Sequence, residues 1–272
     1  MRKLFDRTLS AGLCVAGALI MTPGLMGQRA AVYKAPRAAD GHADISGIWE
    51  ALGTANWDLR DHPSIGGPYY QMGSLGAAPS GRGVVEGGEI PYKPEALAKK
   101  KENFVNRWKL DPEVKCYMPG IPRATYMPFP FQIVQSSKVI LMAYEYASTN
   151  RAINMEKPIE ASVDTWMGTA NGHWDGDTLV VDNTGFNDLS WFDRAGDFHS
   201  DALHVVERFT PMDATHLNYE ATIEDPQVFT RPWKISMPLY RRVEKNAQLA
   251  EFKCVEYAEE LLYGDLRKKT GK

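Results

Sequence analysis

The chain from residue 131 onward consists of short segments in which apolar and polar residues alternate, and this pattern constrains the fold more than any other feature. Turn residues separate the segments, and Trp174-Asp-Gly-Asp177 is typical of a tight hairpin. About eight strands with adjacent hairpins predict a mainly β domain, a single antiparallel β-barrel or sandwich. The expected strands are 44–50, 131–135, 139–146, 151–155, 178–182, 203–210, 216–223, 233–243 and 249–256.

Helices are expected at two places outside these strands. Pro94 suits the first turn of a helix, and Leu97, Phe104 and Trp108 can share its apolar face, which predicts a helix over 94–109. The tail from 257 to 269 favours a short C-terminal helix.

Two stretches of the first half predict irregular chain. The segment 53–91 is rich in Gly, Pro and Ser and shows little periodicity. Prolines recur every few residues between 112 and 130, and they disfavour both helix and central strand. We expect the second stretch to be extended chain lying over a surface.

Residues 1–30 carry the pattern of a secretory signal peptide. Arg2, Lys3 and Arg7 precede an uncharged apolar run over 9–21, and small residues follow near 27–31. The run is shorter than the ~20 residues that a membrane-spanning helix needs, which favours cleavage over anchoring. We therefore expect a signal peptide (1–30), a mobile lead-in (31–44) and a single β-rich domain (45–268), periplasmic or secreted and without a membrane span after cleavage.

The charge of the chain excludes two classes of partner. The chain has 31 Lys+Arg and 34 Asp+Glu, a net charge of −3, and removal of residues 1–30 takes away four basic residues and one acidic residue. The mature chain is then more acidic still. An acidic exported protein lacks the basic surface that nucleic acids need, and it lacks a polybasic stripe for anionic lipid.

Cys116 and Cys254 are the cysteines that remain after signal removal. Two cysteines in an oxidising compartment predict one disulfide, and the alternative is two separate buried thiols. A bridge across so long a loop would stabilise the fold by roughly 4–5 kcal/mol in the chain-entropy model. Neither cysteine has a Cys or His neighbour at ligand spacing, so we expect no metal there.

The loop over 183–202 is dense in ionisable and aromatic residues, which makes it the first candidate for a site. His199 would act as a general base oriented by Asp193 or Asp197, and Glu207 or Glu145, if interior, would be the second carboxylate. Glu207 or Arg208 would polarise the substrate. The alternative is an ordered surface loop held by its own hydrogen bonds.

No metal or cofactor is expected. His199, His204 and Glu207 have a spacing that resembles a ligand set, but His204 and Glu207 point to opposite faces if they lie on a strand. No HExxH, paired CxxC or calcium-loop motif occurs elsewhere. The sequence also lacks a G-x-S-x-G nucleophile motif, so an enzyme would be a lyase or isomerase rather than a hydrolase.

Other residues are candidates for ligand contact. Glu145 lies on an otherwise apolar strand face and needs a partner, and it faces Arg151 if the hairpin turns at 148. Trp166 and Trp191 belong to the polar and aromatic region, and with Arg208 they complete the expected ligand-binding set. Residues 61–63 (Asp-His-Pro) lie in the irregular N-terminal segment and could fold over a cavity mouth.

Several motifs carry a resemblance to a known family. They include Cys116-x-Met-Pro-Gly-Ile-Pro-Arg123, Trp174-Asp-Gly-Asp-Thr-Leu-Val-Val-Asp182, His199-Ser-Asp-Ala-Leu-His-Val-Val-Glu-Arg-Phe209 and Thr230-Arg-Pro-Trp233. Over nearly all of residues 44–262 the chain resembles a family of exported bacterial proteins of no settled activity. The two cysteines belong to the pattern of this family, which supports their pairing. Many members carry a Gly-Arg-Pro-His-Pro stretch after Arg-x-Ile, and this chain lacks that histidine after Arg151-Ala-Ile153.

A second resemblance concerns the barrel itself. Gly47-Ile-Trp49 and the Trp-Asp-Gly-Asp hairpin look like parts of calycin barrels, the lipocalin and fatty-acid-binding class. This implies a calycin-like barrel lined by aromatic residues that binds a small apolar or aromatic molecule. The alternatives are a cofactor-independent acid/base enzyme on the same scaffold, using His199 with Asp193, and a structural protein without a cavity.

Overall fold

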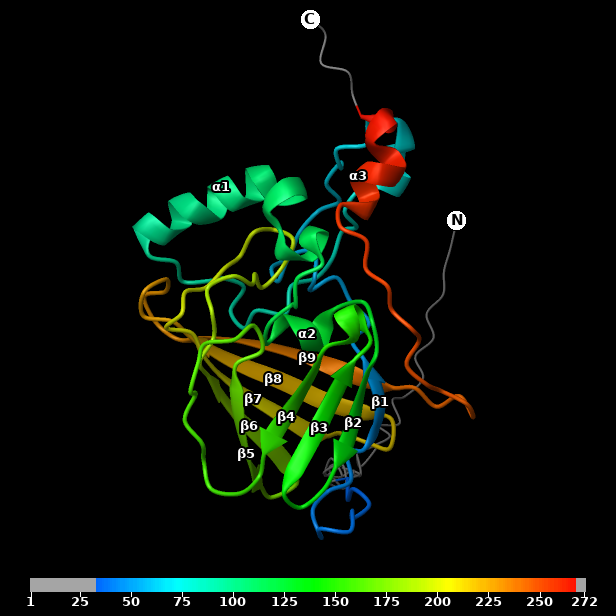
Figure 1. Cartoon of the computed structure of the whole chain (residues 1–272), viewed down its shortest axis with the longest axis vertical. Coiled ribbons are helices and arrows are strands. Elements are labelled where there is room, and N and C mark those ends of the chain that lie inside the picture. The colour runs from blue at the N-terminus through cyan, green and yellow to red at the C-terminus, as the bar shows by residue number, and fades with distance from the viewer. Residues whose placement is uncertain (1–32, 268–272) are drawn as a thin grey trace, which may run out of the picture. The chain divides into compact units, whose positions relative to one another are not determined.

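The computed structural model describes residues 33–267, and the expected signal peptide over 1–30 lies outside them. Within the described residues, nine strands close into a barrel in which neighbours in sequence are neighbours in space (Figure 1). The first strand, β1 (Gly47–Glu50), pairs with both β2 (Phe131–Gln135) and β9 (Trp233–Arg241) and so closes the barrel. The predicted barrel is confirmed, and the sandwich alternative is excluded. The other strands are β3 (Val139–Tyr144), β4 (Asn150–Asn154), β5 (Thr169–Asp175), β6 (Thr178–Thr184), β7 (His204–Pro211) and β8 (His216–Glu224).

Side-chain alternation along the strands places the core inside the barrel. Every second residue of β7 and β8 is buried, as a strand with one face on a core requires. Large side chains fill the interior, and each contributes about 1.5–3 kcal/mol by leaving water. The interior is therefore a packed core, with fully buried Trp49, Phe131, Ile133, Phe209 and Tyr219 among its members.

Among the described strands, β4 and β5 are the one neighbouring pair that runs parallel. Their pairing is short, with only Ile153 opposite Ala170 and Asn154 opposite Asn171. The earlier residues of β4 therefore have no ladder partner on the β5 side. The barrel wall is interrupted there, and this interruption positions one of the two sites described below.

The long helix α1 (Pro94–Leu110) begins at a proline, as predicted, but its buried face is not the predicted one. Ala96, Lys100 and Asn103 are buried, whereas Leu97 is exposed. The helix lies over the connection between β6 and β7 (Figure 1), and Asn103 donates a hydrogen bond of 3.2 Å to the carbonyl of Gly196. Polar residues suit this inner face because Asn103 contacts the β6–β7 connection there, while Ala96 packs with the apolar core.

The other helices are short. They are α2 (Arg123–Tyr126), α3 (Ala258–Tyr263) and the 3-10 helices Tyr70–Gly76, Pro112–Lys115, Tyr146–Ser148 and Gly264–Leu266. The short C-terminal helix was predicted. Within residues 33–267, none of the helices has the length and apolar character that crossing a bilayer requires.

Two predictions about local structure are wrong, one for an irregular stretch and one for a strand. The proline-rich stretch does not lie over a surface, since residues 119–127 are buried and contain α2. The segment 249–256 forms no strand, because β1 already occupies the edge of β9 with which it would have paired. That segment instead carries Cys254 to Cys116, and the predicted disulfide is present with a Cα–Cα distance of 5.7 Å.

Candidate functional site

The connection between β6 and β7 folds inward over the end of the barrel. Trp191 and Phe198 form an isolated bridge, and the amide of Phe192 donates to the carbonyl of Asp197 at 2.7 Å. These contacts form a compact turn that buries the side chains of Asp193, Asp197 and His199. Most of the 191–199 part of the loop expected to hold the chemistry is therefore buried, while other parts of the loop are exposed.

His199 does not pair with Asp193 or Asp197, and the predicted arrangement is wrong. Its Nδ1 lies 2.9 Å from the carbonyl oxygen of Ser200, and its Nε2 lies 2.7 Å from Oγ of Ser190. Nδ1 thus donates its proton to the carbonyl, and Nε2 accepts from the serine hydroxyl. Burial lowers the pKa of His199 below its ordinary value. The side chain is 1% exposed, so substrate access would require the loop to move.

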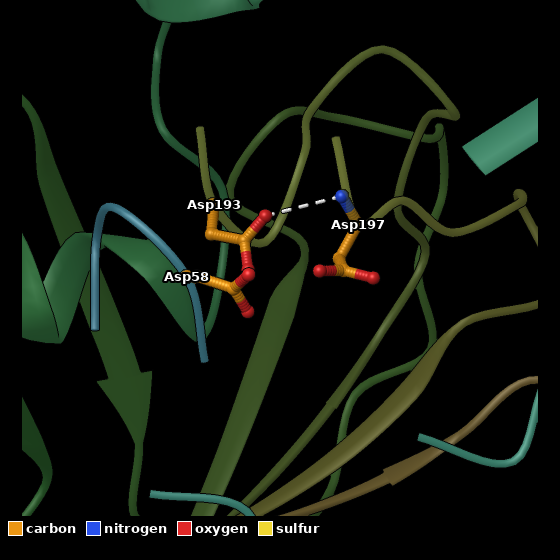
Figure 2. Close-up of side chains that lie close together, drawn as sticks. All are labelled: Asp58, Asp193 and Asp197. Atoms are coloured by element: carbon orange, nitrogen blue, oxygen red, sulfur yellow. Dashed lines mark hydrogen bonds between the residues drawn. The ribbon is translucent and has the colours of Figure 1, made fainter. Parts of the chain in front are cut away.

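Asp193 belongs instead to a group of three carboxylates, which we call the acidic cluster: Asp58, Asp193 and Asp197. One oxygen from each lies within 4.8 Å of the other two (Figure 2). Asp193 accepts hydrogen bonds from the amides of Leu59 (2.9 Å) and Asp197 (3.1 Å). Burial and the neighbouring carboxylates raise the pKa of Asp193 well above its ordinary range.

Two basic side chains approach the acidic cluster without hydrogen-bonding to Asp197. Arg60 Nη2 lies 3.6 Å and Lys100 Nζ 3.9 Å from Oδ2 of Asp197, while Oδ1 accepts a hydrogen bond of 2.9 Å from the hydroxyl of Tyr92. Asp58, Arg60 and Lys100 line a cavity of about 590 Å³ between the 58–65 segment and α1. We call this cavity the α1 cleft, and residues 61–63, expected near a cavity mouth, are part of its wall.

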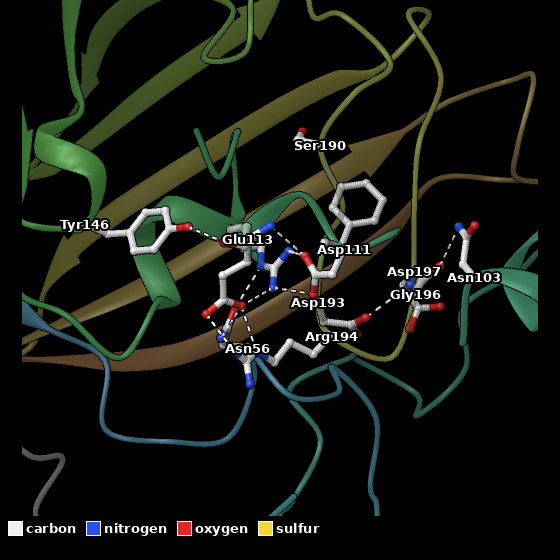
Figure 3. Close-up of polar contacts among 12 residues, drawn as sticks. Asn56, Asn103, Asp111, Glu113, Tyr146, Ser190, Asp193, Arg194, Gly196 and Asp197 are labelled. Atoms are coloured by element: carbon white, nitrogen blue, oxygen red, sulfur yellow. Dashed lines mark hydrogen bonds and ion pairs between the residues drawn. The ribbon is translucent and has the colours of Figure 1, made fainter. Parts of the chain in front are cut away.

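A second polar network holds the other side of the same loop (Figure 3). Arg194 donates to Glu113 at 2.8 Å, and Glu113 also accepts from Arg123 at 2.7 Å. Arg123 forms two further hydrogen bonds with the buried Asp111, at 2.9 and 3.1 Å. These paired charges connect the loop to the 111–123 segment, so we assign them a structural role.

Inside the barrel, the structure brings together two residues that were predicted separately. Arg151 donates to Glu207 at 2.5 and 3.2 Å, and both side chains are almost fully buried. Glu207 also accepts hydrogen bonds from the hydroxyl of Tyr219 (2.8 Å) and the amide of Asn183 (3.0 Å). The carboxylate is thus fully satisfied, whereas Nε of Arg151 is buried and has no hydrogen-bond partner among the described residues.

Arg151 also lines a cavity of about 450 Å³ at the interruption between β4 and β5, which we call the β4–β5 opening. Trp166, another predicted ligand-binding residue, forms part of its wall and packs against Tyr117 with ring centroids 4.9 Å apart. The structure therefore places Arg151 and Trp166 at one cavity, with Glu207 directly behind Arg151. The other lining residues are Met118, Asn150, Ala152, Ile159, Thr165, Met167, Gly168, Thr169 and Ala170.

The remaining predicted residues lie elsewhere. Glu145 does not face Arg151, because β3 ends at Tyr144 and Arg151 lies opposite Met142; the Glu145 carboxylate accepts from the amide of Ala250 at 2.7 Å. Arg208 lies on the outer face of β7 and pairs with Asp175 at 2.8 Å. Trp191 is buried in its loop. His204 and Glu207 point to opposite faces of β7, as alternation predicts.

Sequence reasoning missed Asp58, Arg60, Tyr92 and Lys100. They come from three separate segments that only the folded loop brings together, so no local motif marks them. One signal was present: Ala96, Lys100 and Asn103 are spaced four and three residues apart, which places them on one helical face.

Comparison of the chain with protein-family models, with curated proteins and with solved structures found no match. The proposals below therefore rest on the residues and geometry of this chain.

Proposed function

We propose that this protein binds a small molecule with an apolar or aromatic body and a hydrogen-bond-accepting group, in the periplasm or outside the cell, at the β4–β5 opening. The observation that carries the proposal is that Arg151, whose buried Nε has no hydrogen-bond partner among the described residues, lines a cavity with an aromatic and apolar wall. The ligand was expected inside the barrel, and this proposal moves it to the barrel wall. The barrel interior is packed with side chains, so the ligand enters through the wall.

The size and lining of the opening suit such a ligand. A volume of about 450 Å³ lies within the range of small-molecule sites. Met118 and Ile159 are 44% and 54% exposed at its rim, although apolar side chains of this size favour burial. A ligand with an apolar body would cover them.

Arg151 supplies the polar contact. A buried N–H without a partner costs about 1–3 kcal/mol, and a ligand acceptor at Nε would remove that cost. Glu207 holds the guanidinium through its Nη atoms, which leaves the buried Nε as the nitrogen without a partner, and a small shift of the side chain would bring it to a ligand in the opening. A ligand carboxylate, sulfonate or carbonyl oxygen would satisfy it.

Binding of 8-anilinonaphthalene-1-sulfonate, an aromatic anion, tests the proposal by fluorescence titration. Ala152 is exposed and lines the opening, so Ala152→Trp fills the cavity without touching the core. The expected result is saturable one-site binding by the wild type that weakens at least about tenfold in Ala152→Trp. The matched control, Val134→Trp, adds the same side chain to the outer face of β2 and should bind like the wild type. Equal binding by both variants would refute this location.

The acid/base alternative has weaker support. His199 and Asp193 do not contact each other, and both are buried. The Ser190–His199 pair resembles a nucleophile with its base, but Ser190 is only 2% exposed. Binding is therefore favoured over turnover.

A further inference from the structure

We propose that the acidic cluster at the inner end of the α1 cleft is a binding site for a hard divalent cation of the Mg²⁺, Ca²⁺ and Mn²⁺ class. Figure 2 shows the carboxylates of Asp58 and Asp193 beside each other and that of Asp197 turned toward them. The site is separate from the β4–β5 opening, and the proposal does not depend on ligand binding there.

The geometry of the cluster suits a cation that prefers oxygen ligands. Three carboxylate oxygens lie within 4.8 Å of one another, so an ion among them would be at most about 2.8 Å from each, close to the 2.0–2.6 Å typical of Mg²⁺ and Ca²⁺. The two oxygens of Asp193 each accept one amide hydrogen bond, and each keeps a lone pair for a metal. Asp193 is thus held in place by Leu59 and Asp197 before any ion arrives.

A second observation, independent of the clustering, indicates a missing ligand. Oδ2 of Asp197 belongs to a fully buried side chain and has no hydrogen-bond partner in the described part of the chain. Buried carboxylate oxygens normally accept hydrogen bonds, because an unsatisfied one costs free energy. Arg60 and Lys100 form ion pairs with this oxygen at 3.6 and 3.9 Å, but both stay beyond hydrogen-bond distance. A cation among the three carboxylates would complete the coordination of this oxygen.

The two basic side chains set the strength of the site. Burial and the neighbouring carboxylates raise the pKa of Asp193, so an ion must displace its proton to bind; the three ionised carboxylates then carry one more charge than Arg60 and Lys100 together neutralise. The side-chain hydrogen bonds of Arg60, at 3.2 and 3.3 Å, go to Asp58 and not to Asp197. Because the side chain is also one-third exposed, it can turn away from Asp197 toward the cleft. Nearby positive charge should nevertheless weaken the site. We expect a dissociation constant near 10⁻⁴–10⁻³ M, about that of extracellular calcium modules.

The test is calorimetric titration of the chelator-treated, signal-free protein with Ca²⁺, Mg²⁺ and Mn²⁺ separately. At least one ion should bind with one-to-one stoichiometry. Asp197→Asn keeps the side-chain shape and should weaken binding by more than about a hundredfold, since loss of even an outer partner of a metal ligand costs 10–100-fold. Asp188→Asn is the matched control, because Asp188 is an exposed residue of the same loop. It should bind like the wild type.

A further variant separates a cation site from a structural cluster. Lys100→Met removes a positive charge beside Asp197 and should tighten cation binding by about tenfold, whereas a purely structural role for Lys100 predicts no gain. If Asp197→Asn does not fold, Asp58→Asn replaces it, because Asp58 is partly exposed and lies at the cleft. Three results would each overturn the proposal: no saturable binding of any of the ions up to about 10 mM, tenfold above the expected range; undiminished binding by the Asn variant; or no tightening in Lys100→Met.

Discussion

Replacing Arg151 by methionine should destabilise the barrel because Glu207 would then be buried without its counterion. Glu207 is fully buried and would lose hydrogen bonds of 2.5 and 3.2 Å, although the contacts from Tyr219 and Asn183 would remain. Breaking a buried ion pair by removing one partner costs about 3–5 kcal/mol. The two remaining hydrogen bonds place the expected loss at the lower end, about 3 kcal/mol. For a domain of this size, that corresponds to a fall in Tm of roughly 6–12 °C.

Urea denaturation of the single and double variants measures this effect. Arg151→Met combined with Glu207→Leu removes both charges and should recover most of the stability, because apolar replacements of a buried pair are often neutral or stabilising. The coupling energy between the two positions should therefore exceed about 2 kcal/mol. A loss below about 1 kcal/mol in Arg151→Met, or additive losses in the double variant, would refute the reasoning.

Three further predictions concern other parts of the fold. Burial lowers the pKa of His199, so below about pH 6.5 the unfolded chain takes up a proton before the folded protein does. The free energy of unfolding should therefore fall as the pH drops from there toward the folded-state pKa, and it should fall more steeply in the wild type than in His199→Gln. Unfolding midpoints measured across pH 5–8 check this. Replacing Cys116 and Cys254 together by serine should cost about 2–5 kcal/mol, and limited proteolysis should then cut the chain after β9 first; unchanged stability would contradict the role of the bridge. Arg208→Ala removes a surface ion pair and should change the free energy of unfolding, measured by urea denaturation, by less than about 1 kcal/mol. A larger loss would contradict the assignment of Arg208 to a surface pair.

Most of the strands were predictable because one face of each packs on the core, whereas β5 was not expected, and its burial does not alternate regularly. In β7 and β8 buried and half-buried residues alternate up to the last residue of each strand, and the expected bounds agree with the observed ones to within one residue. Closure was harder to predict, because β1 contributes four residues that pair with strands remote in sequence. The same closure removed the edge that the segment 249–256 was expected to join.

The site was predictable only in part. Arg151 and Trp166 were chosen as polar and aromatic residues in a β-rich region, and the structure places both at one cavity. The predicted partner of Arg151, Glu145, was wrong. Glu145 follows the end of β3 in helical conformation, and its carboxylate accepts a hydrogen bond from the amide of Ala250. The predicted pairing of His199 with an aspartate was wrong for a similar reason. A backbone carbonyl and a serine hydroxyl satisfy its two ring nitrogens, and alternation along the chain predicts neither contact.

A crystal structure of the protein with bound 8-anilinonaphthalene-1-sulfonate tests the central claim most directly. The account predicts density for the probe between β4 and β5, with its rings beside Trp166 and its sulfonate within hydrogen-bond distance of Nε of Arg151. Probe density inside the barrel, or only at another surface, would contradict it.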